Sequence, residues 1–229
     1  MSAKKLPDIY QSVLRETFLP TAAYKRTKDS MITTIIFDLG ETYINGVPGL
    51  EKRLEPILGR KAAQIYAEIQ GEDLLSFFRG ELSEDEYWNR AIKRNCWKVG
   101  ISTLKLVLRE NLYEIKGTRE IIEALKAKGF RLGLLSVHGR EWIDYCESTF
   151  DYHKLFDAVE YSFETGVYKP DRRAYERILG KLKAKPTECL FIDDNPLYLP
   201  PAEALGIKTL LFKNPVGLRK DLLSLGIKI

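Results

Sequence analysis

The stretch MITTIIFDLGET at residues 31–42 constrains the fold of this chain more than any other. Residues 32–37 are β-branched and aromatic almost throughout, which is typical of a strand buried on both faces in the middle of a parallel sheet. Asp38 follows at once, and Gly40 lets the chain leave the strand sharply. Because ligands of open α/β sheets bind just beyond the carboxyl ends of the strands, Asp38 is a candidate site residue. On this stretch alone, a turn-capping aspartate is an equal interpretation.

The composition is that of a soluble globular protein. Of 229 residues, 45% are hydrophobic and 30% are charged, which suits one large domain or a core with a smaller insert. No apolar run approaches the roughly 20 residues that span a bilayer, and the N-terminus lacks the apolar core of a signal peptide. The three cysteines have no paired spacing, which predicts neither a disulfide framework nor a zinc site. We therefore expect a cytoplasmic protein.

The net charge of +4 is concentrated at the N-terminus, where residues 1–30 carry +3. The rest of the chain has no basic stripe, so no nucleic-acid partner is expected. Within residues 1–30, apolar side chains at helical spacing predict a short amphipathic helix followed by a linker. We expect this extension to dock on the body or to contact a partner. Met31 stands directly before the first strand, which raises the hypothesis that translation starts there.

A long stretch after the first strand has helical rather than strand periodicity, with expected interruptions at Pro56 and Gly59. Ser83 and Glu86 have the spacing of a capping box, which predicts that a helix begins there. A helical insert between the first strand and the rest of a sheet is typical of a cap domain. The predicted division is an N-terminal extension at 1–30, an α/β core domain at 31–45 and 116–229, and an α-helical cap domain at 46–115.

Strands and helices alternate along the second half of the chain. Further strands are expected at 131–137, 158–162, 189–192 and 207–212. Helices are expected at 119–128, 141–150 and 171–182, with a last one at the C-terminus. We expect Pro170 to occupy the first turn of the third of these helices. The alternation predicts an α/β fold in which a three-layer, Rossmann-like core holds a parallel sheet with right-handed crossovers.

Polar residues stand at three of the predicted strand ends: Asp38, Ser136, and Asp193 with Asp194. Lys169 precedes a helix in the same half of the fold. Three carboxylates at close range cannot all stay ionised unless a positive charge offsets their repulsion. Mg²⁺ does so with oxygen ligands while keeping waters for a phosphate. The set predicts a phosphoryl-transfer site in which Asp38 is the nucleophile.

Four short motifs together resemble those of the haloacid dehalogenase-like hydrolases. They are FDLGET at 37–42, LLS at 134–136, KPD at 169–171 and FIDDN at 191–195. Each motif is weak alone, but all four occur in the order of that family. The resemblance covers roughly residues 31–215, and the helical insert is similar to the small α-helical cap of the family.

The resemblance implies a Mg²⁺-dependent phosphatase that acts on a small phosphorylated metabolite. It also implies a role for each matching residue: Asp38 as nucleophile and metal ligand, Gly40 as a backbone-carbonyl metal ligand, Ser136 and Lys169 as phosphoryl-binding groups, Asp194 as the main acidic metal ligand, and Asp193 as its direct or water-mediated assistant.

Two positions depart from the family pattern. Gly40 stands where family phosphatases usually have the aspartate that serves as general acid and base. Since such an acid contributes about 10²- to 10⁴-fold, we expect a preference for leaving groups that need little protonation, such as anomeric, acyl or aryl phosphates. Glu41, Thr42 or a water are the candidates to replace it. His138 stands where a small amide is common, and we expect a half-exposed loop histidine.

Other interpretations remain open beside the phosphatase. A catalytically weakened family member that acts as a binding or regulatory protein is favoured only by Gly40. A true haloacid dehalogenase would need no cation, and the pair Asp193 and Asp194 argues against it. A receiver domain carries its acidic pair first in the chain, which is the reverse of the order here. Three aromatic residues are expected to belong to the core of the cap rather than to a substrate site: Tyr43, Tyr87 and Trp88.

Overall fold

The computed structural model describes residues 31–229, so the helix and linker expected within residues 1–30 lie outside it. Five parallel strands form one sheet in the order β3-β2-β1-β4-β5. Their bounds are β1 Thr34–Phe37, β2 Arg131–Ser136, β3 Ala158–Tyr161, β4 Cys189–Asp193 and β5 Lys208–Leu211. All five strands were expected, although β1 begins two residues later than predicted. The predicted α/β fold with a parallel sheet is confirmed.

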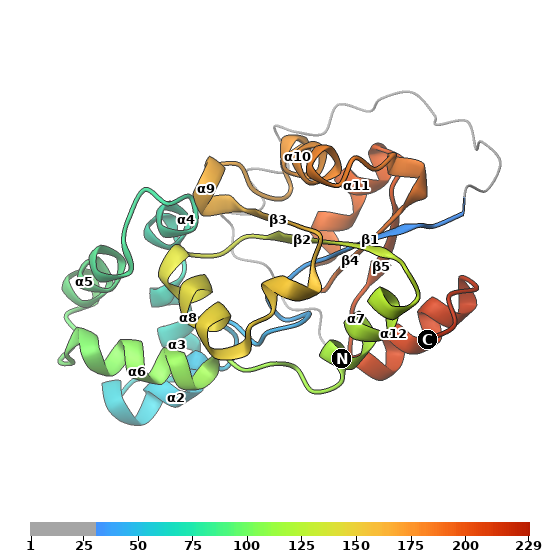
Figure 1. Cartoon of the computed structure of the whole chain (residues 1–229). Coiled ribbons are helices and arrows are strands. Elements are labelled where there is room, and N and C mark those ends of the chain that lie inside the picture. The colour runs from blue at the N-terminus through green and yellow to red at the C-terminus, as the bar shows by residue number, and fades with distance from the viewer. Residues whose placement is uncertain (1–30) are drawn as a thin grey trace.

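Helices cover both faces of this sheet, as Figure 1 shows. Ile35 belongs to the apolar cluster that contains residues of α7, α8 and α12, whereas Ile36 belongs to the cluster of α10 and α11. Successive residues of a strand point to opposite faces, so β1 is buried on both sides as its sequence predicted. The helix bounds are α7 Thr118–Ala127, α8 Arg140–Phe150, α9 Ser162–Thr165, α10 Arg172–Leu182, α11 Leu199–Ala204 and α12 Pro215–Ser224. The three-layer architecture is therefore confirmed.

Five helices lie between β1 and α7, at one side of the sheet in Figure 1. Two linkers join them to the sheet, and Ile44 pairs with Glu114 in an antiparallel bridge between these linkers. The side chains of Tyr43, Tyr87 and Trp88 are all buried, and Tyr87 and Trp88 pack together within the inserted helices as expected. The expectation is wrong for Tyr43, because its ring packs against Tyr152 and Phe156, outside those helices. The division into a core and a cap domain stays a prediction. The inserted helices are α2 Leu50–Leu58, α3 Ala62–Ile69, α4 Glu72–Phe78, α5 Glu84–Asn95 and α6 Ile101–Asn111.

The capping box predicted at the start of α5 is present. The Ser83 hydroxyl accepts from the backbone N–H of Glu86, and the Glu86 carboxylate accepts from the backbone N–H of Ser83. Pro56 does not interrupt its helix as expected, because α2 continues to Leu58 and ends at Gly59, which has a left-handed φ of 62°. Glycine adopts that conformation without the steric cost of a side chain, so it sets the end of the helix.

The prediction that Pro170 occupies the first turn of a helix is wrong. Helix α10 begins at Arg172, and Asp171 is its N-cap, with a side chain that accepts from the backbone N–H of Arg173 at 2.8 Å. An N-cap carboxylate satisfies an otherwise unpaired helical N–H, and it fixed the start of the helix beyond the proline. Short 3₁₀ turns complete the chain at His153–Leu155, Pro186–Glu188 and Pro196–Tyr198. No helix among residues 31–229 is long and apolar enough to cross a membrane.

Candidate active site

The strand order brings the polar strand ends together. Strand β1 lies between β2 and β4, so Asp38, Ser136 and Asp193 emerge at one edge of the sheet. The backbone N–H of Asp38 donates to the carbonyl of Ile192 at 2.9 Å, which extends the pairing of β1 with β4 by one residue. Asp194 follows directly. We call this group of strand-end residues, together with Lys169, the strand-end crevice.

Lys169 lies at the centre of the crevice with only 1% of its surface exposed. Its Nζ donates to Asp38 Oδ1 and to Asp193 Oδ2, both at 2.6 Å. The other oxygen of Asp193 accepts from the backbone N–H of Asn195 at 2.8 Å. The Lys169 ammonium also lies 4.9 Å from the centre of the Tyr198 ring. The ammonium is thus fixed between two carboxylates rather than solvated at the surface.

Carboxylate oxygens of Asp38, Asp193 and Asp194 lie within 4.8 Å of one another. Burial raises the pKa of Asp38 well above its usual value, against the opposing effect of Lys169. Burial and the charge of Asp193 raise the pKa of Asp194 to about 7. Burial lowers the pKa of Lys169, but Asp193 and Asp38 raise it, and the net shift is upward. One ammonium therefore balances only part of the negative charge of three carboxylates.

This donor set fits a hard divalent cation. Clustered carboxylate oxygens are the ligands that Mg²⁺ prefers, and a cation would offset the charge that Lys169 leaves unbalanced. The roles predicted for Asp38, Asp193, Asp194 and Gly40 as metal ligands stay predictions. Asp193 is already engaged on both oxygens by Lys169 and Asn195, so positioning of the lysine is the role that its contacts favour.

Ser136 ends β2 inside the crevice. Its Oγ is buried and has no hydrogen-bond partner among residues 31–229. A buried polar atom without a partner costs free energy, and such atoms in native proteins usually mark a ligand, a water or a functional strain. An unpaired hydroxyl at the sheet edge where Asp38 and Asp193 hold an ammonium is suited to a phosphoryl oxygen. Its predicted phosphate-binding role stays a prediction that this contact pattern favours.

The expectation of a half-exposed His138 is wrong, because only 4% of its surface is exposed. Its ring packs against Phe78 from α4 and Trp142 from α8, with centroid distances of 5.7 and 5.4 Å. Burial lowers the pKa of His138 to about 4. The imidazole is therefore neutral at physiological pH. Its burial depends in part on Phe78, which lies 60 positions earlier in the sequence and which no local pattern indicates.

Gly40 leaves open space where family phosphatases carry an acid. No described atom lies within 4 Å of the position that a Cβ on Gly40 would take. The next residue, Glu41, has a left-handed φ of 54°, and its Oε1 accepts from the backbone N–H of Gly46 at 2.6 Å. Thr42 is fully buried. Neither Glu41 nor Thr42 is thereby assigned the missing acid role.

Sequence reasoning missed two buried polar residues outside the crevice, Ser162 and Glu84. Ser162 follows β3 at the same sheet edge, and its hydroxyl contacts backbone atoms of both α4 and the loop after β2. Glu84 begins α5, and its carboxylate accepts from the indole N–H of Trp142 on α8 at 2.8 Å. The only signal for Ser162 was its place at the end of a predicted strand. Glu84 lay within the recognised capping box but gave no signal of burial.

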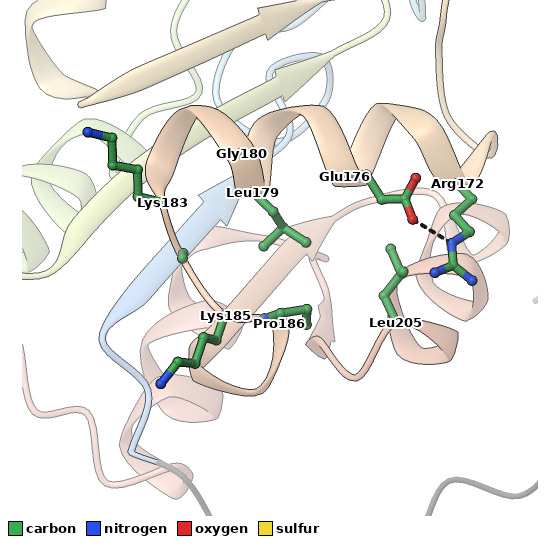
Figure 2. A pocket seen from close by; sticks show the side chains of 9 residues that line it. Arg172, Glu176, Leu179, Gly180, Lys183, Lys185, Pro186 and Leu205 are labelled. Carbon is green, nitrogen blue, oxygen red and sulfur yellow. Dashed lines mark hydrogen bonds and ion pairs between the residues drawn. The ribbon is translucent and has the colours of Figure 1, made fainter.

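A separate groove of about 510 Å³ lies between α10 and the segment that leads into β4, as Figure 2 shows. Leu179 and Leu205 line it, and Lys183 stands at its rim. Arg172 in the same groove is already paired with Glu176 at 2.7 Å. No residue of the strand-end crevice lines it. The groove is therefore separate from the carboxylate cluster.

Comparisons with known proteins agree with this architecture. The family model described as "Haloacid dehalogenase-like hydrolase" matches residues 35–212. Flavin mononucleotide hydrolase 1 of Arabidopsis thaliana is 28% identical over 159 residues, which are 68% of this chain and 62% of that protein. The chain thus spans less than two thirds of the length of that relative.

Solved structures with the same fold include enzymes of two kinds. A haloacid dehalogenase family enzyme from Bacteroides thetaiotaomicron, in complex with magnesium and inorganic phosphate, matches with a TM-score of 0.68 and 19% identity, over 80% of this chain and 95% of that one. The L-2-haloacid dehalogenase RSc1362 matches with a TM-score of 0.64 and 19% identity, over 80% and 86% of the two chains. At these identities the likeness shows the fold alone.

Proposed function

This chain belongs to the haloacid dehalogenase-like hydrolases, and from that premise we propose that it is a Mg²⁺-dependent phosphatase acting on a small phosphorylated metabolite through Asp38. The observation that carries the proposal is the buried Lys169 ammonium between two carboxylates, together with the unpaired hydroxyl of Ser136 at the same sheet edge. This arrangement suits a group that brings its own negative oxygens and needs fixed donors around them.

The proposed reaction has two displacement steps. An oxygen of Asp38 attacks phosphorus, the bond from phosphorus to the leaving oxygen breaks, and that oxygen takes a proton from water. A water molecule then attacks the aspartyl-phosphate, which releases inorganic phosphate and restores the carboxylate. Lys169 and Ser136 hold the phosphoryl oxygens through both steps. Bound Mg²⁺, held by Asp38, Asp194 and the carbonyl of Gly40, would neutralise charge on the phosphoryl group.

Gly40 bears on the choice of substrate. Without a carboxylic acid at this position, the departing oxygen has no side-chain donor from Gly40, and leaving groups that need little protonation are favoured. The proposal therefore includes a preference for aryl, acyl or anomeric phosphates over simple alkyl phosphates. The name of the Arabidopsis relative refers to a flavin mononucleotide, whose phosphate is an alkyl ester. We do not extend that substrate to this chain, because Gly40 argues against it.

The test is a turnover assay over a panel of phosphate esters with and without Mg²⁺. Asp38→Asn is the reaction-blocking variant, and Asp144→Asn, which alters an exposed aspartate on α8, is the matched control. We expect hydrolysis by wild type and Asp144→Asn only, and only with Mg²⁺. Turnover by Asp38→Asn, or turnover without metal, would contradict the mechanism. Binding of Mg²⁺ without hydrolysis of any ester would support the alternative of a binding or regulatory protein, which Gly40 favours.

A dehalogenase remains a weaker alternative. The fold is shared with an L-2-haloacid dehalogenase, and displacement of a halide by Asp38 would need no cation. The excess negative charge of Asp38, Asp193 and Asp194 argues against it, because this cluster leaves a strong field for a divalent ion. Incubation with L-2-chloropropionate in the same assay distinguishes the two, since release of chloride without Mg²⁺ would establish the alternative.

A further inference from the structure

The end of α4 lies against the loops that follow β2 and β3. The hydroxyl of Ser162, which is 2% exposed, donates to the carbonyl of Phe78 at 2.6 Å. The same hydroxyl accepts from the backbone N–H of His138 at 3.1 Å. One side chain thus joins the backbone of an inserted helix to the backbone of the loop after Ser136. Both contacts are buried, where hydrogen bonds are hardest to replace with water.

Two glycines allow the backbones to approach this closely. A Cβ on Gly139 would lie 1.9 Å from Cζ of Phe77, so the ring packs directly on the loop backbone. A Cβ on Gly80, whose φ is 75°, would lie 2.4 Å from the carbonyl oxygen of Phe163. Real Cβ atoms do not come this near to other atoms. The contact between α4 and the two loops therefore depends on backbone fit on both sides of the Ser162 hydroxyl.

Few residues separate the contact of Ser162 with α4 from Ser136, the predicted phosphate-binding residue. In the sheet, Ser136 lies opposite Tyr161, so Ser162 stands immediately beside the loop that Ser136 begins. His138 is two residues beyond Ser136, and Ser162 holds its N–H. The Ser162 hydroxyl has one proton, and its distance to the carbonyl of Phe78 is shorter than the 3.3 Å to the carbonyl of His138. If α4 moved away, this proton would turn to the carbonyl of His138, and the hydrogen bonds that hold the backbone of the loop would change with the position of α4.

From these contacts we propose that Ser162 is a positioning residue, which couples the docking of α4 to the orientation of Ser136 for phosphate binding. The inference rests on the proposed phosphatase function, because it assigns Ser136 to the phosphoryl group. Coupling of two sites is reciprocal. Phosphate bound at Ser136 must therefore stabilise the docked position of α4, to the same extent that docking of α4 improves phosphate binding.

The experiment compares Ser162→Ala with Ser148→Ala on the full chain. Ser148 is the matched control, because its exposed hydroxyl donates to the carbonyl of Tyr145 on its own helix and to no other described residue. Circular dichroism first establishes that both variants are folded. We expect Ser162→Ala to lower kcat/KM for para-nitrophenyl phosphate, and to weaken binding of inorganic phosphate in the presence of Mg²⁺, each by about tenfold. Binding of Mg²⁺ alone should stay within about twofold of wild type.

Amide hydrogen exchange supplies the readout that a purely structural role would not change. In wild type and Ser148→Ala, inorganic phosphate with Mg²⁺ should slow exchange at residues 74–80, which comprise the end of α4 and the two residues that follow it. In Ser162→Ala, phosphate at saturating concentration should no longer slow it. If Ser162→Ala keeps this response and binds phosphate like Ser148→Ala, the positioning role is overturned while the phosphatase function stands. If wild type neither hydrolyses esters nor binds phosphate, the proposed function and the inference built on it both fail.

Discussion

Two buried groups of charged residues in this protein differ in how completely they are satisfied. In the strand-end crevice, three carboxylates within 4.8 Å of one another face the single ammonium of Lys169. The Ser136 hydroxyl beside them has no partner within residues 31–229. Burial raises the pKa of Asp38 and of Asp194. This group keeps excess charge and an unused donor.

The other group surrounds Glu84, where α5 meets α8. One oxygen of Glu84 accepts from the indole N–H of Trp142 at 2.8 Å and from that of Trp88 at 3.4 Å. The other oxygen accepts from Arg109 at 2.5 Å. Both oxygens of this single buried carboxylate thus have donors, and a cation faces it directly. The Glu84 carboxylate itself is therefore fully paired, and such a group holds helices together.

The difference shows that burial of a charge does not by itself identify a functional site. Both regions contain acids with almost no exposed surface. What separates them is the acid itself: three clustered carboxylates with one hydrogen-bonded ammonium in the crevice, against a single carboxylate with donors on both oxygens in the Glu84 group, where Nη1 of Arg109 is the atom left unpaired. Removing a side chain from the crevice should therefore mainly lower the rate of catalysis. Removing the Glu84 carboxylate should mainly lower the free energy of unfolding.

The largest expected effect comes from Lys169→Met, which removes the only ammonium hydrogen-bonded to Asp38 and Asp193 within the described chain. The nucleophile then loses its charge partner and the phosphoryl group loses a donor. We expect kcat to fall on the order of 10⁴-fold. The matched control is Lys220→Met, an exposed lysine on α12, which should keep full activity. A loss of less than tenfold in Lys169→Met would show that the crevice does not need the ammonium.

The sequence could predict this crevice because each of its strand-end residues directly follows a strand that the neighbouring residues identify. A strand buried on both faces, followed by a polar residue, recurs at Asp38, Ser136 and Asp193, and parallel strands end at a common edge. The strand bounds followed from runs of β-branched residues for the same reason. Polar residues at the ends of strands can thus be recognised from each strand separately.

The rest depended on contacts between distant segments. His138 is buried by Phe78, which lies 60 positions earlier in the chain, and nothing near His138 in the sequence indicates that partner. Ser162 and Glu84 acquire their roles in the same way, through α4 and α8. Pro170 was placed wrongly for a more local reason, because the N-cap preference of Asp171 outweighed the preference of proline for a first turn.

The Glu84 group should show its effect in stability. Glu84→Gln leaves Arg109 without a charge partner on a side chain that is largely buried. We expect the free energy of unfolding in urea to fall by about 3 to 5 kcal/mol. Asp85→Asn is the matched control, because Asp85 is the next residue and its side chain is 62% exposed. Its ion pair should contribute less than about 1 kcal/mol. Equal losses in the two variants would remove the contrast with the crevice.

His138 connects the two regions, and its burial predicts a pH dependence. Burial lowers the pKa of His138 to about 4 from the usual 6.5. As pH falls from 6.5 to 4, His138 therefore binds a proton in the unfolded chain but stays neutral in the folded protein, and the free energy of unfolding decreases. At about 1.4 kcal/mol per pH unit, we expect wild type to lose about 2 to 3 kcal/mol more than His138→Asn over this range. Above pH 6.5 the free energies of unfolding of wild type and His138→Asn should change with pH in parallel.

The control for this pH series is His153→Asn. His153 is the other histidine of the chain, and its side chain is 38% exposed. Urea unfolding of wild type and both variants at several pH values between 4 and 8 tests whether loss of a partly exposed histidine changes the pH profile as loss of the buried one does. If His138→Asn loses stability on acidification as steeply as wild type, then His138 takes up its proton in the folded state and is not as buried as the structure places it.

The smallest expected effect is a gain. Gly40→Asp adds a carboxylic acid to the crevice, and there is room, since no described atom lies within 4 Å of the new Cβ. We expect hydrolysis of alkyl phosphates to rise about tenfold relative to aryl phosphates, less than an evolved acid provides because nothing yet orients this one. Gly40→Asn, which has the same shape but no acidic proton, should leave the ratio unchanged. A fourth carboxylate should also lower the stability of the metal-free protein by about 1 kcal/mol. If the alkyl-to-aryl ratio stayed constant in Gly40→Asp, protonation of the leaving group would not be what this crevice lacks.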